Sequence, residues 1–125
     1  MISIDDVLAL HEASIEDFGG AKGVRDVGLL ESAIARPFQT FDGEDLYPTA
    51  IEKAAAFGES LIINHPFIDG NKRTGLLGIT TLLFEYGIQL SAAPDIAYDF
   101  IIKISTGELK FDQIVIWLKE NTFSL

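Results

Sequence analysis

The sequence predicts an all-α domain, a compact bundle around one central helix with a small β-hairpin between two of the helices. Three observations lead to this prediction. Apolar residues recur at helical spacing in most segments that glycine or proline bounds. Leu, Ile and Phe cover most of the circumference of the segment from 71 to 86, so this helix is expected at the centre. The Asp42-Gly43 pair favours a tight turn and supplies the hairpin.

The first two helices are predicted by their caps. Ser3 and Asp6 form a capping box for a helix that should end at the glycine pair 19–20. Asp26 can cap a second helix, from Val27 to Arg36, because its carboxylate can accept hydrogen bonds from the first turn. The proline that follows stops this helix, since proline cannot continue it.

The remaining helices are bounded by proline, glycine and aspartate. Pro48 suits the first position of a third helix that runs to about Asn64. This helix should end at or just before His65, because a residue that precedes proline is pushed out of helical conformations. Asp112 is the expected cap of the last helix. The elements that follow the third helix are expected at 71–86, 88–90 (extended), 95–105 and 112–121.

The composition is that of one globular domain spanning 1–125, with 48% hydrophobic and 22% charged residues. The absence of cysteine excludes disulfides, thiolate metal ligands and cysteine nucleophiles, and it fits a reducing compartment. The N-terminus lacks the pattern of a secretory signal, and no apolar run is long enough to span a membrane. We therefore expect a cytoplasmic protein without a membrane partner.

The charge balance bears on partners. The net charge is −10, and the chain has only nine Lys and Arg residues. Such a surface repels nucleic-acid phosphate, so no direct nucleic-acid partner is expected. An acidic body suits a protein partner with a basic patch, although solubility alone is the simpler explanation.

One loop carries most of the functional information. Residues 65 to 73 read His-Pro-Phe-Ile-Asp-Gly-Asn-Lys-Arg. Between 60 and 84 the only formal charges are Asp69, Lys72 and Arg73. A charge inside an apolar core is costly unless it is paired, so this cluster calls for a functional explanation.

The second half of the loop predicts a phosphate site. It lies at the N-terminus of the central helix, where free N–H groups and the helix dipole attract anions. Gly70 lets the backbone approach an anion, and Asn71 can cap the helix, hold the loop or contact a ligand. Lys72 and Arg73 oppose the dipole at about 0.3–1 kcal/mol each, and a bound phosphate would reverse that sign.

The first half of the loop supplies groups for chemistry on that phosphate. Asp69 is a hard oxygen ligand, and Mg²⁺ is typically held by one or two carboxylates plus substrate phosphates. His65 is the one group in the loop that accepts a proton near neutral pH. Together these residues fit phosphate transfer, which needs positioning, charge neutralisation and a base.

These residues also have plainer interpretations. His65 can be a C-terminal helix cap, and Asp69 can cap the central helix and pair with Lys72 or Arg73. Phe67 fits a core plug that pins the loop. Other polar residues receive no chemical role. These are His11, the only other histidine, and Ser60 and Thr74, which are interpreted as helix residues rather than nucleophiles; two histidines without cysteine do not predict a zinc site.

The nine-residue loop resembles the signature of the Fic/Doc superfamily, H-x-F-x-[D/E/N]-[G/A]-N-[G/K]-R. Its lysine before the arginine is similar to the Doc (death-on-curing) branch, and the stretch from Val24 to Pro37 resembles the Doc second helix. The resemblance spans nearly the whole chain. It implies the toxin of a toxin–antitoxin pair, which uses ATP to phosphorylate a Ser or Thr hydroxyl of translation elongation factor Tu and so blocks translation.

The resemblance also implies residue roles. His65 is then the base for the target hydroxyl, and Asp69 holds Mg²⁺ directly or through water. Gly70, Asn71 and Lys72 form the phosphate cradle, and Arg73 neutralises phosphate charge. Residues 38–46 match a flap that aligns the target chain by strand addition.

Two residues depart from the Fic proteins that transfer AMP. Lys72 replaces the glycine before the arginine, and Leu76 stands where a second arginine is expected. Both favour phosphoryl transfer. No convincing inhibitory [S/T]-x-x-x-E-[G/N] segment is present, so a separate antitoxin with a segment that folds on binding is the implied regulator. A Fic-type AMP transferase and a non-catalytic binding module on the same fold are the alternatives.

Overall fold

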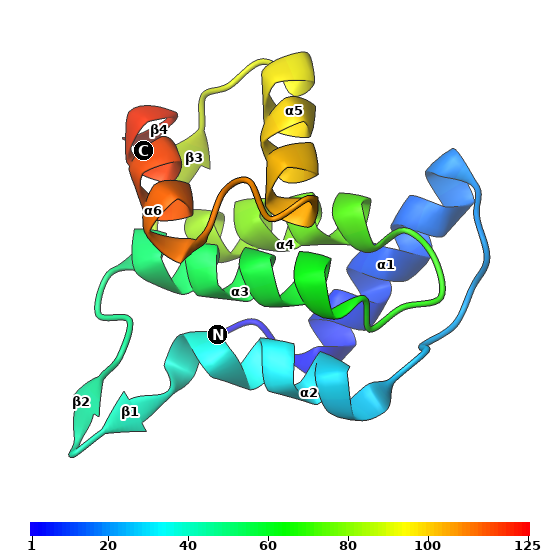
Figure 1. Cartoon of the computed structure of the whole chain (residues 1–125), viewed down its shortest axis with the longest axis horizontal. Coiled ribbons are helices and arrows are strands. Elements are labelled where there is room, and N and C mark those ends of the chain that lie inside the picture. Colours follow the sequence, from blue (N-terminus) through cyan, green and yellow to red (C-terminus); the bar gives the residue numbers. More distant parts are fainter.

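The computed structural model describes the whole chain, residues 1–125. It contains six α-helices, one 3₁₀-helix and two pairs of short antiparallel strands (Figure 1). The helices are α1 (Ile4–Phe18), α2 (Val27–Ala35), η1 (Arg36–Phe38), α3 (Ala50–Asn64), α4 (Asn71–Glu85), α5 (Pro94–Ser105) and α6 (Phe111–Glu120). The strands are β1 (Thr40–Phe41), β2 (Glu44–Asp45), β3 (Ile88–Leu90) and β4 (Thr122–Ser124). The prediction of an all-α fold with a small hairpin is confirmed.

Helices α3 and α4 run side by side through the middle of the molecule, with α1 and α2 on one side and α5 and α6 on the other (Figure 1). Nine residues of α3 and seven of α4 are buried. Leu77 and Phe84 of α4 are 36% and 64% exposed. Helix α4 therefore lies at the centre of the fold as expected, and it shares that position with α3.

Three glycines bring α3 and α4 close together. Glycine weakens a helix interior by about 1 kcal/mol relative to alanine, so its presence here needs a packing reason. A Cβ atom at each position would meet a side chain of the facing helix at a distance that real Cβ atoms do not show. The pairs are Gly58 with Ile79 Cδ1 (2.4 Å), Gly75 with Ile62 Cγ1 (2.5 Å) and Gly78 with Phe57 Cε2 (2.6 Å).

The hairpin of β1 and β2 lies far from the loop that follows α3. Phe41 pairs with Glu44, and the turn residues Asp42 and Gly43 have φ of 55° and 80°, as the tight turn requires. The hairpin precedes α3 and projects at its N-terminal end, whereas residue 65 lies at its C-terminal end (Figure 1). Fifteen helical residues span about 22 Å. The hairpin edge is therefore not beside His65, and its expected role in aligning a target chain remains a prediction.

The extended piece at 88–90 is confirmed, but its partner was not predicted. Strand β3 pairs antiparallel with β4 at the C-terminus, with Ile88 opposite Ser124 and Leu90 opposite Thr122. This pairing ties the end of the chain to the turn after α4. None of the helices combines the length and the apolar character needed to cross a membrane.

Several helix boundaries differ from the predicted ones, and three of them have a clear physical reason. Helix α3 begins at Ala50 rather than at Pro48, and Thr49 caps it, because the Thr49 hydroxyl accepts a hydrogen bond from Glu52 N at 3.1 Å. Helix α2 ends at Ala35, and the chain tightens into η1 around the next proline. Helix α6 begins at Phe111, so Asp112 lies inside its first turn instead of capping it.

Candidate active site at the junction of helices α3 and α4

The loop from 65 to 70 turns the chain from the end of α3 into the start of α4. His65 is the C-cap residue that follows α3, and it adopts the left-handed conformation, with φ 50° and ψ 57°. This conformation costs a non-glycine residue roughly 1–2 kcal/mol. The plainer interpretation of His65 as a helix cap is thus confirmed, and the strain indicates that the surrounding structure holds it there.

The imidazole of His65 is exposed and oriented by its own helix. Its Nδ1 atom lies 3.0 Å from the carbonyl oxygen of Ile63. A carbonyl oxygen can only accept, so Nδ1 carries the proton in this arrangement. In the neutral ring Nε2 is then the unprotonated nitrogen, and no group of the chain donates to it, so it can accept a proton from another molecule.

Asn71 holds the loop instead of capping α4. Its Oδ1 atom accepts a hydrogen bond from Phe67 N, and its Nδ2 atom donates to Phe67 O, both at 3.0 Å. The N-cap position belongs to Gly70, whose φ of 76° places it in the left-handed region. The expectation that Asn71 caps the helix is therefore corrected, and its expected role in holding the loop is confirmed. Phe67 itself is 1% exposed, as expected for a core plug.

Asn71→Ala is expected to lower the free energy of unfolding by about 2–6 kcal/mol. The change leaves a buried N–H and a buried C=O of Phe67 without partners, at about 1–3 kcal/mol each. Urea unfolding measures the effect. Asn64→Ala is the matched control, because no hydrogen bond involves the Asn64 side chain, and it should stay within about 0.5 kcal/mol. Equal urea midpoints for both variants would contradict the prediction.

Asp69 is fixed by backbone donors from two directions. Its Oδ2 atom accepts from Ala21 N at 3.2 Å, and Oδ1 accepts from Gly70 N at 2.8 Å. The hydrogen bond from Ala21, followed by that from Gly70, holds the pKa of this carboxyl below its ordinary value. Asp69 is therefore ionised throughout the neutral range. It forms no ion pair with Lys72 or Arg73, so the plainer pairing interpretation is wrong.

The donor set at Asp69 fits a magnesium ion only if phosphate and water complete the coordination. The carboxylate is exposed and ionised, and each oxygen accepts only one N–H. No cluster of three His, Cys, Asp or Glu side chains exists in the structure. Such a carboxylate matches the usual Mg²⁺ arrangement of one or two protein oxygens plus substrate phosphates.

His11 has a structural role that the sequence interpretation missed. It is 5% exposed, its Nε2 lies 2.8 Å from the carbonyl oxygen of Asp69, and its ring stacks on Phe67 at 3.8 Å. The assignment of no role is therefore corrected. A signal was present, because His11 shares the buried face of α1 with Val7 and Ile15 at helical spacing.

The two cations of the loop, Lys72 and Arg73, lie in the first turn of α4. The N–H groups of residues 71 to 73 have no partner within the helix, because they belong to its first turn. Lys72 is half-buried and Arg73 is exposed. The Arg73 guanidinium lies 5.0 Å from the centre of the Phe18 ring, and no carboxylate pairs with it. The structure thus brings the predicted residues of the phosphate cradle to one helix end.

An apolar groove begins at Arg73. It has a volume of about 540 Å³ and lies between the end of α1, the outer face of α4 and the start of α5. Its lining includes side chains that are unusually exposed for apolar residues, with Phe18 at 68% and Tyr98 at 55%. The groove is lined by Phe18, Arg73, Leu76, Leu77, Pro94 and Tyr98.

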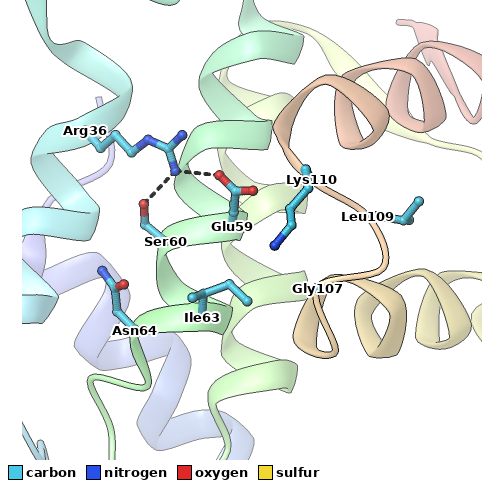
Figure 2. Close-up of a pocket in the computed structure, with 8 residues that line it drawn as sticks. All are labelled: Arg36, Glu59, Ser60, Ile63, Asn64, Gly107, Leu109 and Lys110. Atoms are coloured by element: carbon cyan, nitrogen blue, oxygen red, sulfur yellow. Dashed lines mark hydrogen bonds and ion pairs between the residues drawn. The ribbon is translucent and has the colours of Figure 1, made fainter.

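A second, polar cleft of about 170 Å³ lies between α3 and the turn from α5 to α6. Figure 2 shows Arg36 reaching across from η1 to Glu59 and Ser60, at 2.9 and 3.0 Å. Ser60 is therefore occupied as an acceptor, and Thr74 is fully buried. Neither hydroxyl is placed as a nucleophile, in agreement with the sequence interpretation, and no residue from 65 to 73 lines this cleft.

Comparison with known proteins identifies the family of this chain. The Fic/DOC family model matches residues 1–83. The chain is 44% identical over 99 residues to "Toxin Doc" of Mycolicibacterium smegmatis (strain ATCC 700084 / mc(2)155), which covers 78% of this chain and 76% of that protein. It is 31% identical over 113 residues to "Protein kinase doc" of Escherichia phage P1, which covers 90% of this chain and 88% of that protein. The loop of residues 65 to 73, the helical fold and these relatives together show that the chain belongs to the Fic/DOC family, on its Doc branch.

Proposed function

We propose that this chain is a Doc-type toxin that transfers the γ-phosphoryl group of ATP to a Ser or Thr hydroxyl of a protein target. The proposed target is translation elongation factor Tu, whose modification would block translation. The observation that carries the proposal is the pairing of a free imidazole Nε2 on His65 with a cationic helix N-terminus a few residues later. The names of the two relatives, a toxin and a protein kinase, support it.

In the proposed reaction, His65 acts as the base and the residues at the start of α4 hold the phosphate. His65 Nε2 accepts the proton of the target hydroxyl, and the hydroxyl oxygen forms a bond to the γ-phosphorus of ATP. The bond from that phosphorus to the β–γ bridging oxygen breaks, and ADP leaves. The N–H groups of residues 71 to 73, with Lys72 and Arg73, hold the phosphate oxygens. Mg²⁺, when bound at Asp69, would neutralise phosphate charge.

The alternative of AMP transfer is less well supported by the cradle residues. Lys72 occupies the position of the glycine in AMP-transferring Fic proteins, and its half-buried side chain fills space that a glycine would leave open. Leu76, one turn further along α4, offers no second guanidinium for another phosphate group. Both features favour an arrangement in which the terminal phosphate, rather than the α-phosphate, is the transferred group.

Labelled ATP distinguishes the two reactions. The chain is incubated with bacterial extract and with ATP labelled at either the α or the γ phosphate, and protein-bound label is measured. Label from the γ position alone supports the kinase, and a labelled band at the size of elongation factor Tu supports the proposed target. Label from the α position alone would establish AMP transfer instead. No label from either position would favour the non-catalytic binding module.

Arg73→Ala is expected to remove most of the thermal protection that ATP-Mg²⁺ gives. Ligand at a hundred times its Kd stabilises the native state by roughly 2.7 kcal/mol, which is about 10 °C in Tm for a domain of this size. Arg73 can donate two parallel hydrogen bonds to a phosphate, so its loss weakens binding. Lys119→Ala, which removes an exposed cation from α6, is the control. Equal protection of both variants would place the phosphate site elsewhere.

We also propose that the antitoxin segment docks in the groove that begins at Arg73. The groove exposes apolar side chains beside the phosphate cradle, so an occupant would cover both. A segment that folds on binding can fill it with apolar side chains at helical spacing and can present a carboxylate to Arg73. Such an occupant would exclude the nucleotide phosphate and explain inhibition.

Tyr98→Glu is expected to weaken inhibition by the antitoxin at least tenfold and to leave label transfer unchanged. Tyr98 lines the groove but is remote in sequence from the catalytic loop, and a buried carboxylate among apolar groups is costly. The probe is a small protein encoded directly upstream, the expected position of an antitoxin gene, and it is titrated into the labelling assay. Ile116→Glu is the matched control, because both side chains are 55% exposed. Equal inhibition of both variants would exclude the groove.

A further inference from the structure

The segment between α1 and α2 donates hydrogen bonds to the backbone of the loop that carries His65. Arg25 donates from Nε to the carbonyl oxygen of His65 at 2.7 Å and from Nη2 to that of Asn64 at 2.8 Å. Its backbone N–H donates to the carbonyl oxygen of Pro66 at 2.7 Å. Arg25 therefore donates to three successive carbonyl groups at and just beyond the end of α3, where helical partners are lacking, and Asp26 N also donates to that of Pro66 at 3.1 Å.

These hydrogen bonds of Arg25 lie where the backbone is strained. His65 lies in the left-handed conformation, and its two flanking peptide groups are the ones that Arg25 contacts. No carboxylate pairs with the Arg25 guanidinium, so its charge and its hydrogen bonds are directed at the end of α3. A cation at a helix C-terminus also interacts favourably with the helix dipole.

Arg25 supplies the only side-chain donors to the carbonyl groups on either side of His65. Asn71 satisfies both backbone groups of Phe67, and His11 takes the carbonyl oxygen of Asp69. Those contacts fix the half of the loop that leads into α4. No side chain other than Arg25 donates to a carbonyl between 64 and 66.

We infer that Arg25 is a positioning residue for His65. By fixing the peptide groups on both sides of His65, it keeps the imidazole where Nδ1–H reaches Ile63 O and Nε2 faces outward. Arg25 lies 40 positions away in the sequence and touches neither the phosphate cradle nor Asp69 in any hydrogen bond of the structure. This role rests on the proposed phosphoryl transfer, since it concerns the base of that reaction.

The test compares Arg25→Ala and Arg25→Lys with Lys22→Ala, which removes an exposed cation of the same segment that makes no hydrogen bond. Transfer of γ label is measured over a range of ATP concentrations. Arg25→Ala should lower kcat by about ten- to a hundredfold, because small displacements of a catalytic group have effects of that size. The KM for ATP should stay within about twofold, because the cradle is held by other residues. The kcat of Arg25→Lys should lie between those of Arg25→Ala and the wild type, because one ammonium group replaces the two guanidinium nitrogens that donate.

A second readout needs no activity. The ¹⁵N spectrum of the His65 imidazole, assigned by its absence in His65→Asn, reports which ring nitrogen carries the proton. The wild type and Lys22→Ala should show protonated Nδ1, and Arg25→Ala should show a tautomer mixture. If the wild type transfers no phosphoryl group, the proposed function fails, but the spectra still decide the role of Arg25. Unchanged spectra, unchanged kcat, or a loss of activity that lies entirely in KM would each overturn it.

Discussion

His65→Asn is expected to reduce γ-label transfer by about 10²–10⁴-fold, the usual contribution of a general base. Asparagine is chosen because it tolerates the left-handed conformation that His65 adopts at the end of α3, whereas most residues do not. The substitution therefore removes the proton acceptor and keeps the helix cap. Initial rates at saturating ATP-Mg²⁺ measure the effect.

Two controls make this result specific. The Tm of His65→Asn should stay close to that of the wild type, and ATP-Mg²⁺ should still protect it, because Arg73 and the helix end are unchanged. His11→Asn is the informative comparison, since it alters a histidine that is buried and contacts the loop. It should lower Tm as well as activity. Full transfer by His65→Asn would exclude His65 as the base.

Gly78→Val is expected to lower the free energy of unfolding by about 1–3 kcal/mol, which is roughly 4–12 °C in Tm for a domain of this size. A Cβ atom at this position would lie 2.6 Å from Cε2 of Phe57, and the Phe57 ring is fully buried and cannot swing away. The two helices must therefore separate or repack. Calorimetry or urea unfolding measures the change.

The control for Gly78→Val places the same β-branched residue on the outer side of the same helix. Leu77→Val should cost only a few tenths of a kcal/mol, because Leu77 is 36% exposed and valine is only slightly the poorer helix former. The difference in unfolding free energy between the two variants separates the cost of crowding between α3 and α4 from the cost of valine's lower helix propensity. Equal Tm values would show that α3 and α4 can move apart without loss.

Local patterns predicted the elements of this fold well. Caps, glycine stops and apolar periodicity act over a few residues, so the sequence shows them directly. Thus Ser3 and Asp26 cap α1 and α2 as expected. Predictions failed where two local signals competed. Pro48 and Thr49 both favour a helix start, and the hydrogen bond of the Thr49 hydroxyl makes Thr49 the cap of α3.

The site was predicted as a set of residues, but the contacts that support it were not. His65 to Arg73 are contiguous, so the loop itself is visible in the sequence. The contacts of His11 with Asp69 and of Arg25 with His65 join positions 58 and 40 residues apart. Only the packing of α1 and α2 beside the loop creates them, and no periodicity encodes which distant carbonyl a side chain will meet.

The hydrogen bonds that α1 and the α1–α2 segment make to the loop have a consequence for the energetics of nucleotide binding. Every carbonyl from Asn64 to Phe67, and that of Asp69, already has a partner before any ligand arrives. A preorganised loop loses little conformational entropy on binding, so more of the interaction energy appears as affinity. Association would then be limited by diffusion of ATP to the helix end and not by closure of a flexible lid.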